Sequence, residues 1–175
     1  MALLRINKLS VAFGIHRLLN EANLVIQRGD RIGLLGRNGE GKSTLLKIIN
    51  GDIPYDEGEL QGLDALRIAK LDQAPSLDGP QSVYQVVASG LGEIGTDIAR
   101  YHELGTQAGD SALAEMSDIQ GRIESAHAWP LMRNREKTIR KLGLVADQRV
   151  KALSGGWQRR VSLARALVIE PDLLL

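Results

Sequence analysis

Apolar and polar residues alternate or form short runs over the first seventy positions of the chain, a pattern typical of strands joined by tight turns. The segment 41–50 differs, because its apolar residues recur at helical spacing, and this pattern stops at Gly51. We therefore expect strands at 3–13, 22–27, 31–36 and 66–72, a helix at 41–50 and a turn-rich segment at 51–62.

From Gln73 to Val150 the pattern changes to apolar residues repeated at three and four positions. Glycine and proline interrupt this pattern at Gly79-Pro80, Gly109 and Pro130. The spacing predicts helices within 82–91, 96–104, 111–129 and 131–144. A helical subdomain thus follows a β-rich segment, and no internal repeat or low-complexity tract is present.

The composition is ordinary for a soluble globular protein: 175 residues, 43% hydrophobic and 25% charged. No run approaches the ~20 apolar residues of a membrane span, and the N-terminus lacks the apolar core of a signal peptide. Cysteine is absent, which excludes disulfides and thiolate metal sites and fits a reducing cytosol. The three histidines share no metal-like spacing. We expect a soluble, cytoplasmic protein without membrane insertion.

The net charge is only +1, but the charges are unevenly distributed along the chain. Residues 52–130 carry four basic and fourteen acidic residues, whereas residues 131–165 carry ten basic and two acidic residues. The basic block is either an ordinary solvated helical surface or a surface that faces the phosphates of a nucleotide or RNA.

The segment "GRNGEGKST", Gly36 to Thr44, matches the phosphate-binding P-loop pattern G-x-x-x-x-G-K-[ST]. An expected apolar strand precedes it and an expected helix follows, so backbone N–H groups and the helix dipole would converge on phosphate. In such loops the lysine, here Lys42, reaches the β- and γ-phosphates, and the following hydroxyl, here Ser43, ligates Mg²⁺. The alternative is a glycine-rich turn without a ligand. We expect the P-loop to bind a nucleoside triphosphate.

A second motif lies more than a hundred residues further on, in "LSGGWQRRVSLARALVIEPDLLL". This segment resembles the LSGGQ signature of ATP-binding cassette (ABC) proteins, followed by its helix and the start of the Walker B strand. The resemblance covers essentially the whole chain in the expected order. It implies an α/β fold: a P-loop NTPase of ABC type with an N-terminal β-subdomain and an inserted helical subdomain.

The resemblance also implies roles for residues outside the two motifs. Gln73 lies where the family has its Q-loop glutamine, which touches Mg²⁺ and the attacking water. Phe13 lies 23 positions before Gly36, where the family stacks an aromatic ring on adenine. The expected ATP-binding residues are Phe13, Gly36, Asn38, Gly39, Gly41, Lys42, Ser43, Thr44, Ser154, Gly155 and Gly156, with Lys42 and Gln73 catalytic and Ser43 and Gln73 at Mg²⁺.

In ABC proteins two cassettes pair head to tail, so the signature of one closes over the ATP held by the other. Gly155 and Gly156 would allow the backbone to approach a γ-phosphate, and Ser154 would offer its hydroxyl and cap the following helix. The alternative is an ordinary Ser-Gly-Gly loop that starts an amphipathic helix.

Trp157 departs from the glutamine that transporter ATPases usually have after the glycines. "LSGGW" followed by basic residues resembles the ABC-F family, soluble tandem-cassette ATPases of which several act on the ribosome. Within that family, the sequence most resembles the first cassette of the Uup-type branch. The 81 positions from Gln73 to Ser154 fit a short version of the ABC-F arm. Trp157 could instead only pack at a helix start, and Arg159 and Arg160 either are solvated or touch nucleotide or partner.

We expect three segments: 1–72, the β-subdomain and P-loop; 73–150, the inserted helical subdomain; and 151–175, the signature, its helix and the start of the Walker B strand. The chain stops before the expected Walker B aspartate and the glutamate that acts as general base, so it looks like an N-terminal piece of a longer protein. We expect this piece alone to hydrolyse almost no ATP.

The expected activity of the whole protein is ATP binding and hydrolysis, coupled to a closing motion between two cassettes and acting on the ribosome. Three alternatives remain. A transporter subunit would have a coupling surface for a membrane protein, and an ATP-gated binding module would turn over slowly. A DNA-repair ATPase would show long heptad runs between the two motifs, and none are present.

Overall fold

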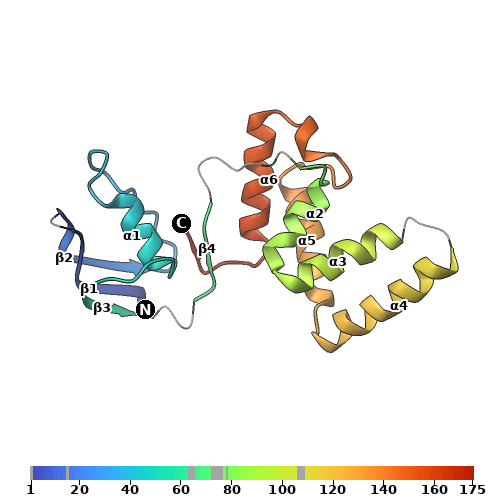
Figure 1. Cartoon of the computed structure of the whole chain (residues 1–175), viewed down its shortest axis with the longest axis horizontal. Helices are drawn as coiled ribbons and strands as arrows, with labels where there is room; N and C mark the ends of the chain where they lie inside the picture. Colours follow the sequence, from blue (N-terminus) through green and yellow to red (C-terminus); the bar gives the residue numbers. More distant parts are fainter. Residues whose placement is uncertain (1, 15, 63–65, 72–76, 78, 106–108) are drawn as a thin grey trace. The chain divides into compact units, whose positions relative to one another are not determined.

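The computed structural model describes the chain except residues 1, 15, 63–65, 72–76, 78 and 106–108. The chain divides into two compact units (Figure 1). The first, the sheet unit, comprises residues 1–70 and 172–175, and the second, the helical unit, comprises residues 71–171. Each unit is described by itself.

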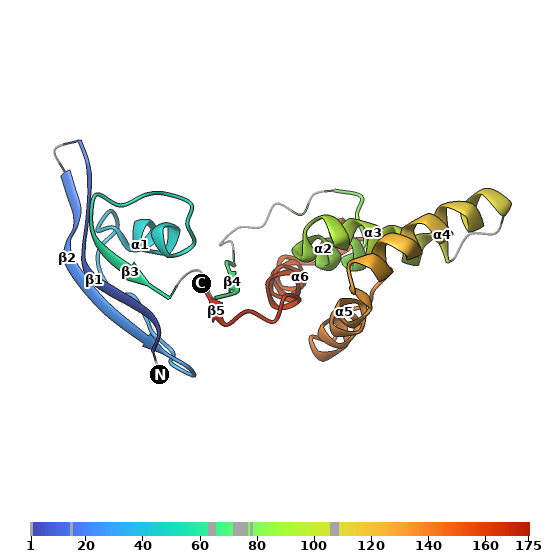
Figure 2. The ribbon, with the colours of Figure 1, turned by 90° about the horizontal axis from the view of Figure 1, so that it is seen from below.

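The sheet unit contains a three-stranded antiparallel sheet in the order β2-β1-β3. Its strands are β1 (Ala2–Phe13), β2 (His16–Gln27) and β3 (Glu57–Gln61). Helix α1 (Lys42–Ile49) lies against the concave face of the curved sheet (Figure 2). The expected strands at 3–13 and 22–27 and the expected helix at 41–50 are confirmed. Strand β3 was missed, because its polar sequence "EGELQ" becomes a strand only by pairing with β1.

A bulge between Ile6 and Leu9 keeps the apolar residues of β1 on the core face of the sheet. Leu4 and Ile6 are buried at alternate positions, and Leu9 and Val11 continue the pattern one residue out of phase. Between Ile6 and Leu9 the pairing with β2 shifts register, and Lys8 takes a φ of 48° there. The side chain of Asn23 closes this bulge by accepting a hydrogen bond from the Lys8 amide at 2.9 Å. An extra residue in one strand restores the alternation that a regular strand would have lost.

Helix α1 supplies the other side of this core. Leu45, Ile48 and Ile49 are buried, the three-and-four spacing of a helix that presents one apolar face. A separate two-stranded parallel sheet joins β4 (Ile68–Ala69) to β5 (Leu173–Leu174). The Asp172 carboxylate accepts hydrogen bonds from the backbone and the side chain of Arg67, which holds the pKa of Asp172 below its usual value.

The strand expected at residues 31–36 is absent, so that prediction was wrong. Residues 31–37 are irregular, and Leu35 is 96% exposed. No described strand pairs with them, and an apolar run becomes a strand only where neighbours satisfy its backbone groups. An apolar cavity of about 580 Å³ adjoins this segment and is lined by Ile32, Leu34, Leu45 and Leu174 among others.

The helical unit consists of short helices whose first member has a reciprocal cap. Ser82 and Gln85 each bond the other's backbone amide at the start of α2. The helices are α2 (Val83–Ala88), η2 (Ser89–Leu91), α3 (Glu93–Leu104), α4 (Asp110–Ser125), α5 (Trp129–Lys141), η3 (Val150–Ala152) and α6 (Gly155–Leu167). Each predicted helical segment overlaps one or more of these.

Apolar side chains of α2, α5 and α6 form the main core of the helical unit. Val87, Ile139, Val161 and Val168 are among its buried members. Gly90 lies where η2 meets the end of α6, and a Cβ there would lie 2.2 Å from the carbonyl oxygen of Arg165. This close approach explains a glycine at a position whose backbone conformation does not require one.

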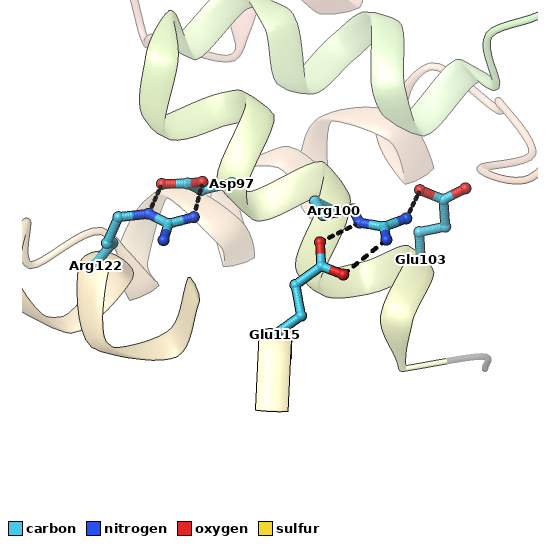
Figure 3. Close-up of polar contacts among 5 residues, drawn as sticks. All are labelled: Asp97, Arg100, Glu103, Glu115 and Arg122. Atoms are coloured by element: carbon cyan, nitrogen blue, oxygen red, sulfur yellow. Dashed lines mark hydrogen bonds and ion pairs between the residues drawn. The ribbon is translucent and has the colours of Figure 1, made fainter. Parts of the chain in front are cut away.

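Helices α3 and α4 form an antiparallel hairpin that has its own small core and two groups of ion pairs (Figure 3). Arg100 binds Glu115 through two hydrogen bonds of 2.7 and 2.9 Å and also contacts Glu103. Arg122 binds both carboxylate oxygens of Asp97, at 2.7 and 2.9 Å. The acidic residues of this hairpin are thus partly neutralised by two arginines.

Candidate nucleotide-binding site

The predicted P-loop lies in the sheet unit and leads directly into α1, which begins at Lys42. Gly36, Gly39 and Gly41 have φ values of 150°, 88° and 82°, in the region that favours glycine. Gly41 caps the helix without a side chain, so no side chain satisfies the amides of the first turn. No acidic residue lies in that turn either. The start of α1 therefore presents N–H groups and positive dipole density, as an anion site requires.

The start of β2 fixes the end of this loop. A Cβ on Gly41 would lie 2.9 Å from the carbonyl oxygen of Leu18, so no other residue fits there. Strand β2 begins at His16, which pairs with Phe13 at the end of β1. Phe13 is 56% exposed at the end of β1, so its ring is available to a ligand. Its stacking on adenine stays a prediction.

Lys42 folds back over the loop, and its ammonium group donates hydrogen bonds to the carbonyl oxygens of Gly36 and Arg37 at 2.7 and 2.5 Å. Ser43 is exposed one residue further along. In such sites Mg²⁺ is coordinated by protein and phosphate oxygens and usually keeps several waters. The residues therefore fit a nucleotide phosphate with Mg²⁺, in which Ser43 would contribute its hydroxyl. Asn38 and Thr44 lie in the same segment, and Gln73 lies outside the described residues.

The described residues include no group of three or more His, Cys, Asp or Glu side chains that could hold a metal ion.

The signature residues Ser154, Gly155 and Gly156 lie together at the start of α6, in the helical unit. Ser154 occupies the N-cap position with φ −65° and ψ 158°, but its side chain makes no capping hydrogen bond, so the predicted cap was wrong. The first turn is exposed, so water can satisfy its amides and the serine hydroxyl is left for another partner. A Cβ on Gly155 or on Gly156 would meet nothing within 4 Å.

Trp157 and Arg160 contact each other on the exposed surface of α6. The guanidinium carbon of Arg160 lies 4.5 Å from the centroid of the Trp157 ring, within the range of a cation–π contact. Trp157 is 39% exposed, so it does not simply pack into the core at the helix start. Arg159 is exposed as well.

The basic block at 131–165 separates into one buried and nine exposed residues. The exposed ones are Arg133, Lys137, Arg140, Lys141, Arg149, Lys151, Arg159, Arg160 and Arg165. None of the nine forms an ion pair with a carboxylate within the described part of the chain. Arg135 is fully buried, so neither expectation for this block, a solvated surface or a surface that faces phosphates, holds for that residue.

Sequence reasoning missed Glu40, which lies inside the P-loop. Its carboxylate accepts a hydrogen bond from the Arg37 amide at 2.8 Å. The sequence did contain a signal that could have identified Glu40: an acidic residue at a variable position of a loop whose other residues favour an anion.

A glycine-rich loop that leads into a helix start without a side-chain cap, with its lysine folded over the loop, is the pattern of P-loop nucleotide-binding proteins. Residues 19–175 match the protein family described as ABC transporter, so the chain belongs to that family. The fold class predicted from the sequence, an α/β P-loop NTPase of ABC type, is confirmed. The described residues contain no helix long and apolar enough to cross a membrane.

Similar proteins refine this assignment. The chain is 37% identical to the ATP-binding protein Uup of Haemophilus influenzae and 34% identical to that of Escherichia coli, each match covering 100% of the chain. It is 33% identical over 96% of its length to the energy-dependent translational throttle protein EttA of Mycobacterium tuberculosis. The predicted resemblance to Uup-type ABC-F proteins is confirmed. The chain spans 28% of the length of both Uup proteins and 31% of EttA.

The fold is also similar to a nucleotide-free ATP-binding cassette from an ABC transporter, with a TM-score of 0.69 and 23% sequence identity. That similarity covers 99% of this chain and 68% of the other chain.

Proposed function

We propose that the protein binds ATP with Mg²⁺ at the P-loop and hydrolyses it after a second cassette closes over the nucleotide. The phosphates lie on the amides at the start of α1, with Lys42 moving from the loop carbonyls to the β- and γ-phosphates. Ser43 and Gln73 would take part in holding Mg²⁺, and Gln73 would orient the attacking water. The Phe13 ring stacks on adenine.

The observation that carries this proposal is the space around Gly155 and Gly156. Neither has a φ in the region that favours glycine, and a Cβ on either would meet nothing within 4 Å. The fold of this chain therefore gives no reason for glycine at these positions, although alanine is the better helix former. Glycine is explained if another molecule approaches the backbone closely there. A γ-phosphate held by a second cassette, on the first-turn amides and the free Ser154 hydroxyl, fits that requirement.

In this proposal the catalytic power comes mainly from positioning and charge. Phosphoryl transfer to water needs an aligned nucleophile and neutralised phosphate oxygens more than covalent help from the protein. Lys42, Mg²⁺ and the helix starts of two cassettes supply that neutralisation. Because the γ-phosphate is enclosed only when cassettes pair, ATP binding and pairing favour each other.

We further propose that the protein works in the cytoplasm and acts on the ribosome. Two features support this: similarity to EttA, whose name assigns it to translation, and the nine exposed basic residues of the helical unit without described carboxylate partners. Lysine and arginine side chains without carboxylate partners favour a polyanion such as ribosomal RNA, because binding releases condensed counterions.

A nucleotide-binding subunit of an ABC transporter is the second candidate, favoured by the match to the ABC transporter family and by the fold similarity to transporter cassettes. Co-sedimentation of the full-length protein with purified ribosomes distinguishes the two. We expect ATP to promote binding and Lys42→Ala to abolish that effect. Absence of ribosome binding with and without ATP would favour the transporter subunit.

A further inference from the structure

We propose that Glu40 is a positioning residue that holds the P-loop in its phosphate-binding conformation before the nucleotide arrives. It does so through the hydrogen bond from the Arg37 amide to its carboxylate, which we call the clasp. This inference rests on the proposed nucleotide site, but its first test needs no nucleotide. The P-loop pattern leaves position 40 open to any residue, so the pattern itself assigns no role to a glutamate there.

Two hydrogen bonds between Arg37 and Glu40 close the turn at residues 37–40. The Arg37 amide donates to the Glu40 carboxylate at 2.8 Å, and the Glu40 amide donates to the Arg37 carbonyl oxygen at 3.4 Å. Gly39 occupies the third position of this turn with a φ of 88°, as a type II turn requires. The side chain therefore adds a second closure to a turn that one weak backbone bond would hold poorly.

Gly36 makes room for this carboxylate. A Cβ on Gly36 would lie 2.6 Å from the Glu40 carboxylate oxygen that accepts the bond from Arg37. Any larger residue at Gly36 would displace the carboxylate from the Arg37 amide. In this protein the first glycine of the P-loop thus serves the clasp as well as the loop conformation.

Glu40 and Lys42 hold the same short stretch of backbone from two sides. The Lys42 ammonium donates to the carbonyl oxygens of Gly36 and Arg37, while Glu40 binds the Arg37 amide. No ion pair joins the Glu40 carboxylate to Lys42 within the described P-loop, so the lysine charge remains available for phosphate. When Lys42 leaves the carbonyls to bind phosphate, Glu40 keeps the turn closed.

The carboxylate also brings a negative charge close to the phosphate position. Its charge opposes the phosphates of ATP, whereas its hydrogen bond favours the loop conformation that binds them. The two effects separate on substitution, because glutamine keeps an oxygen acceptor and loses the charge, and alanine loses both.

The first test measures hydrogen exchange of the Arg37 amide in the nucleotide-free, full-length protein by NMR. We expect protection in the wild type and in Glu40→Gln, and exchange about tenfold faster in Glu40→Ala, because an amide that loses its acceptor exchanges more readily. Glu57→Ala, an exposed glutamate on β3 of the same unit, is the control and should leave the exchange unchanged. Equal exchange in the wild type and Glu40→Ala would overturn the proposal.

The second test compares the binding of ATP and adenosine to the same variants. We expect Glu40→Ala to bind ATP about fivefold more weakly, the effect of losing one hydrogen bond. We expect Glu40→Gln to bind ATP at least as tightly as the wild type, and all variants to bind adenosine alike. ATP affinity in Glu40→Ala equal to that of the wild type would count against a positioning role. If Lys42→Ala and the wild type bound ATP equally, the nucleotide site itself would be wrong, while the exchange measurement would still decide the clasp.

Discussion

The guanidinium group of Arg135 lies over the ring of Tyr84, with its central carbon 3.5 Å from the ring centroid. Both residues are buried, Arg135 fully, and one guanidinium nitrogen donates to the Tyr84 hydroxyl. The other two nitrogens have no hydrogen-bond partner in the described part of the chain. On the opposite side, His102 stacks on Tyr84 with ring centroids 3.7 Å apart. A buried cation is thus held by a tyrosine instead of a carboxylate.

This arrangement predicts a strong dependence of stability on the tyrosine hydroxyl. Tyr84→Phe should destabilise the protein by about 1–3 kcal/mol, because the buried guanidinium loses its hydrogen-bond acceptor. Burial raises the pKa of Tyr84 to about 12, so the phenol stays neutral through the ordinary pH range. Urea unfolding, followed by circular dichroism, measures the change.

Replacing Arg135 itself should not lower the stability of the fold. Arg135→Met keeps much of the volume and removes a desolvated charge, so stability should be unchanged or higher. In that background Tyr84→Phe should cost clearly less than in the wild type, because no guanidinium remains to be left without an acceptor. An equal cost in both backgrounds would mean that the hydroxyl does not act through Arg135.

The exposed basic residues of α5 should bind RNA in the ribosome complex. Reversing Lys137, Arg140 and Lys141 to glutamate should weaken ribosome co-sedimentation at low salt and flatten its salt dependence. The slope of log K against log salt should fall by about 0.7–0.9 for each RNA phosphate that the variant no longer neutralises. Lys47→Glu, on an exposed position of the sheet unit, is the control. Arg135 is left in place, because reversing a buried charge would unfold the helical unit. Unchanged binding at every salt concentration would exclude this surface.

The ion pairs of the α3–α4 hairpin predict a loss of stability in acid. Hydrogen bonds from Arg122 and Arg100 lower the pKa values of Asp97 and Glu115 below their usual 3.8 and 4.5. A carboxylate with a lowered folded-state pKa stabilises the fold above its unfolded-state pKa and stops doing so as pH falls through the folded-state value. Asp97→Asn should therefore lower stability slightly at pH 7 and have no effect well below pH 3.8. A constant difference across that range would show that the pairing does not depend on ionisation.

Nucleotide binding should depend on Phe13 through stacking. Because base stacking on an aromatic ring contributes roughly 1–3 kcal/mol, Phe13→Ala should weaken ATP binding by about one to two decades, and GTP binding by a similar factor. Val25→Ala, which removes another exposed apolar side chain of the sheet, is the matched control. Titration with fluorescent ATP measures both; an unchanged dissociation constant would remove Phe13 from the site.

The sequence predicted those elements whose residues determine them locally. Strands β1 and β2, helix α1 and the helices of the second unit follow from apolar periodicity, and the P-loop follows from its glycines and lysine. Features that depend on distant partners were not predictable. Strand β3 exists because β1 pairs with it, and residues 31–36 form no strand because no described strand pairs with them.

Two errors concerned side chains rather than elements. The burial of Arg135 depends on a tyrosine 51 positions away, which no local pattern reveals. Ser154 has the sequence and the backbone conformation of a capping residue, yet its hydroxyl makes no cap. A hydroxyl rotates freely between partners, so its hydrogen bond cannot be derived from its position alone.

The most direct test of the central claim, that a second cassette's ATP lies against the bare backbone of the signature, compares Gly156→Ala with Gly121→Ala. Both glycines lie in helices, and a Cβ on either would meet nothing within 4 Å. Neither variant should lose stability, since alanine is favoured over glycine in helices by roughly 1 kcal/mol. In the full-length protein, we predict that Gly156→Ala lowers the steady-state rate of ATP hydrolysis about tenfold or more, whereas Gly121→Ala leaves the rate unchanged. A tenfold loss is equivalent to about 1.4 kcal/mol of transition-state stabilisation. Equal hydrolysis by the two variants would contradict the account.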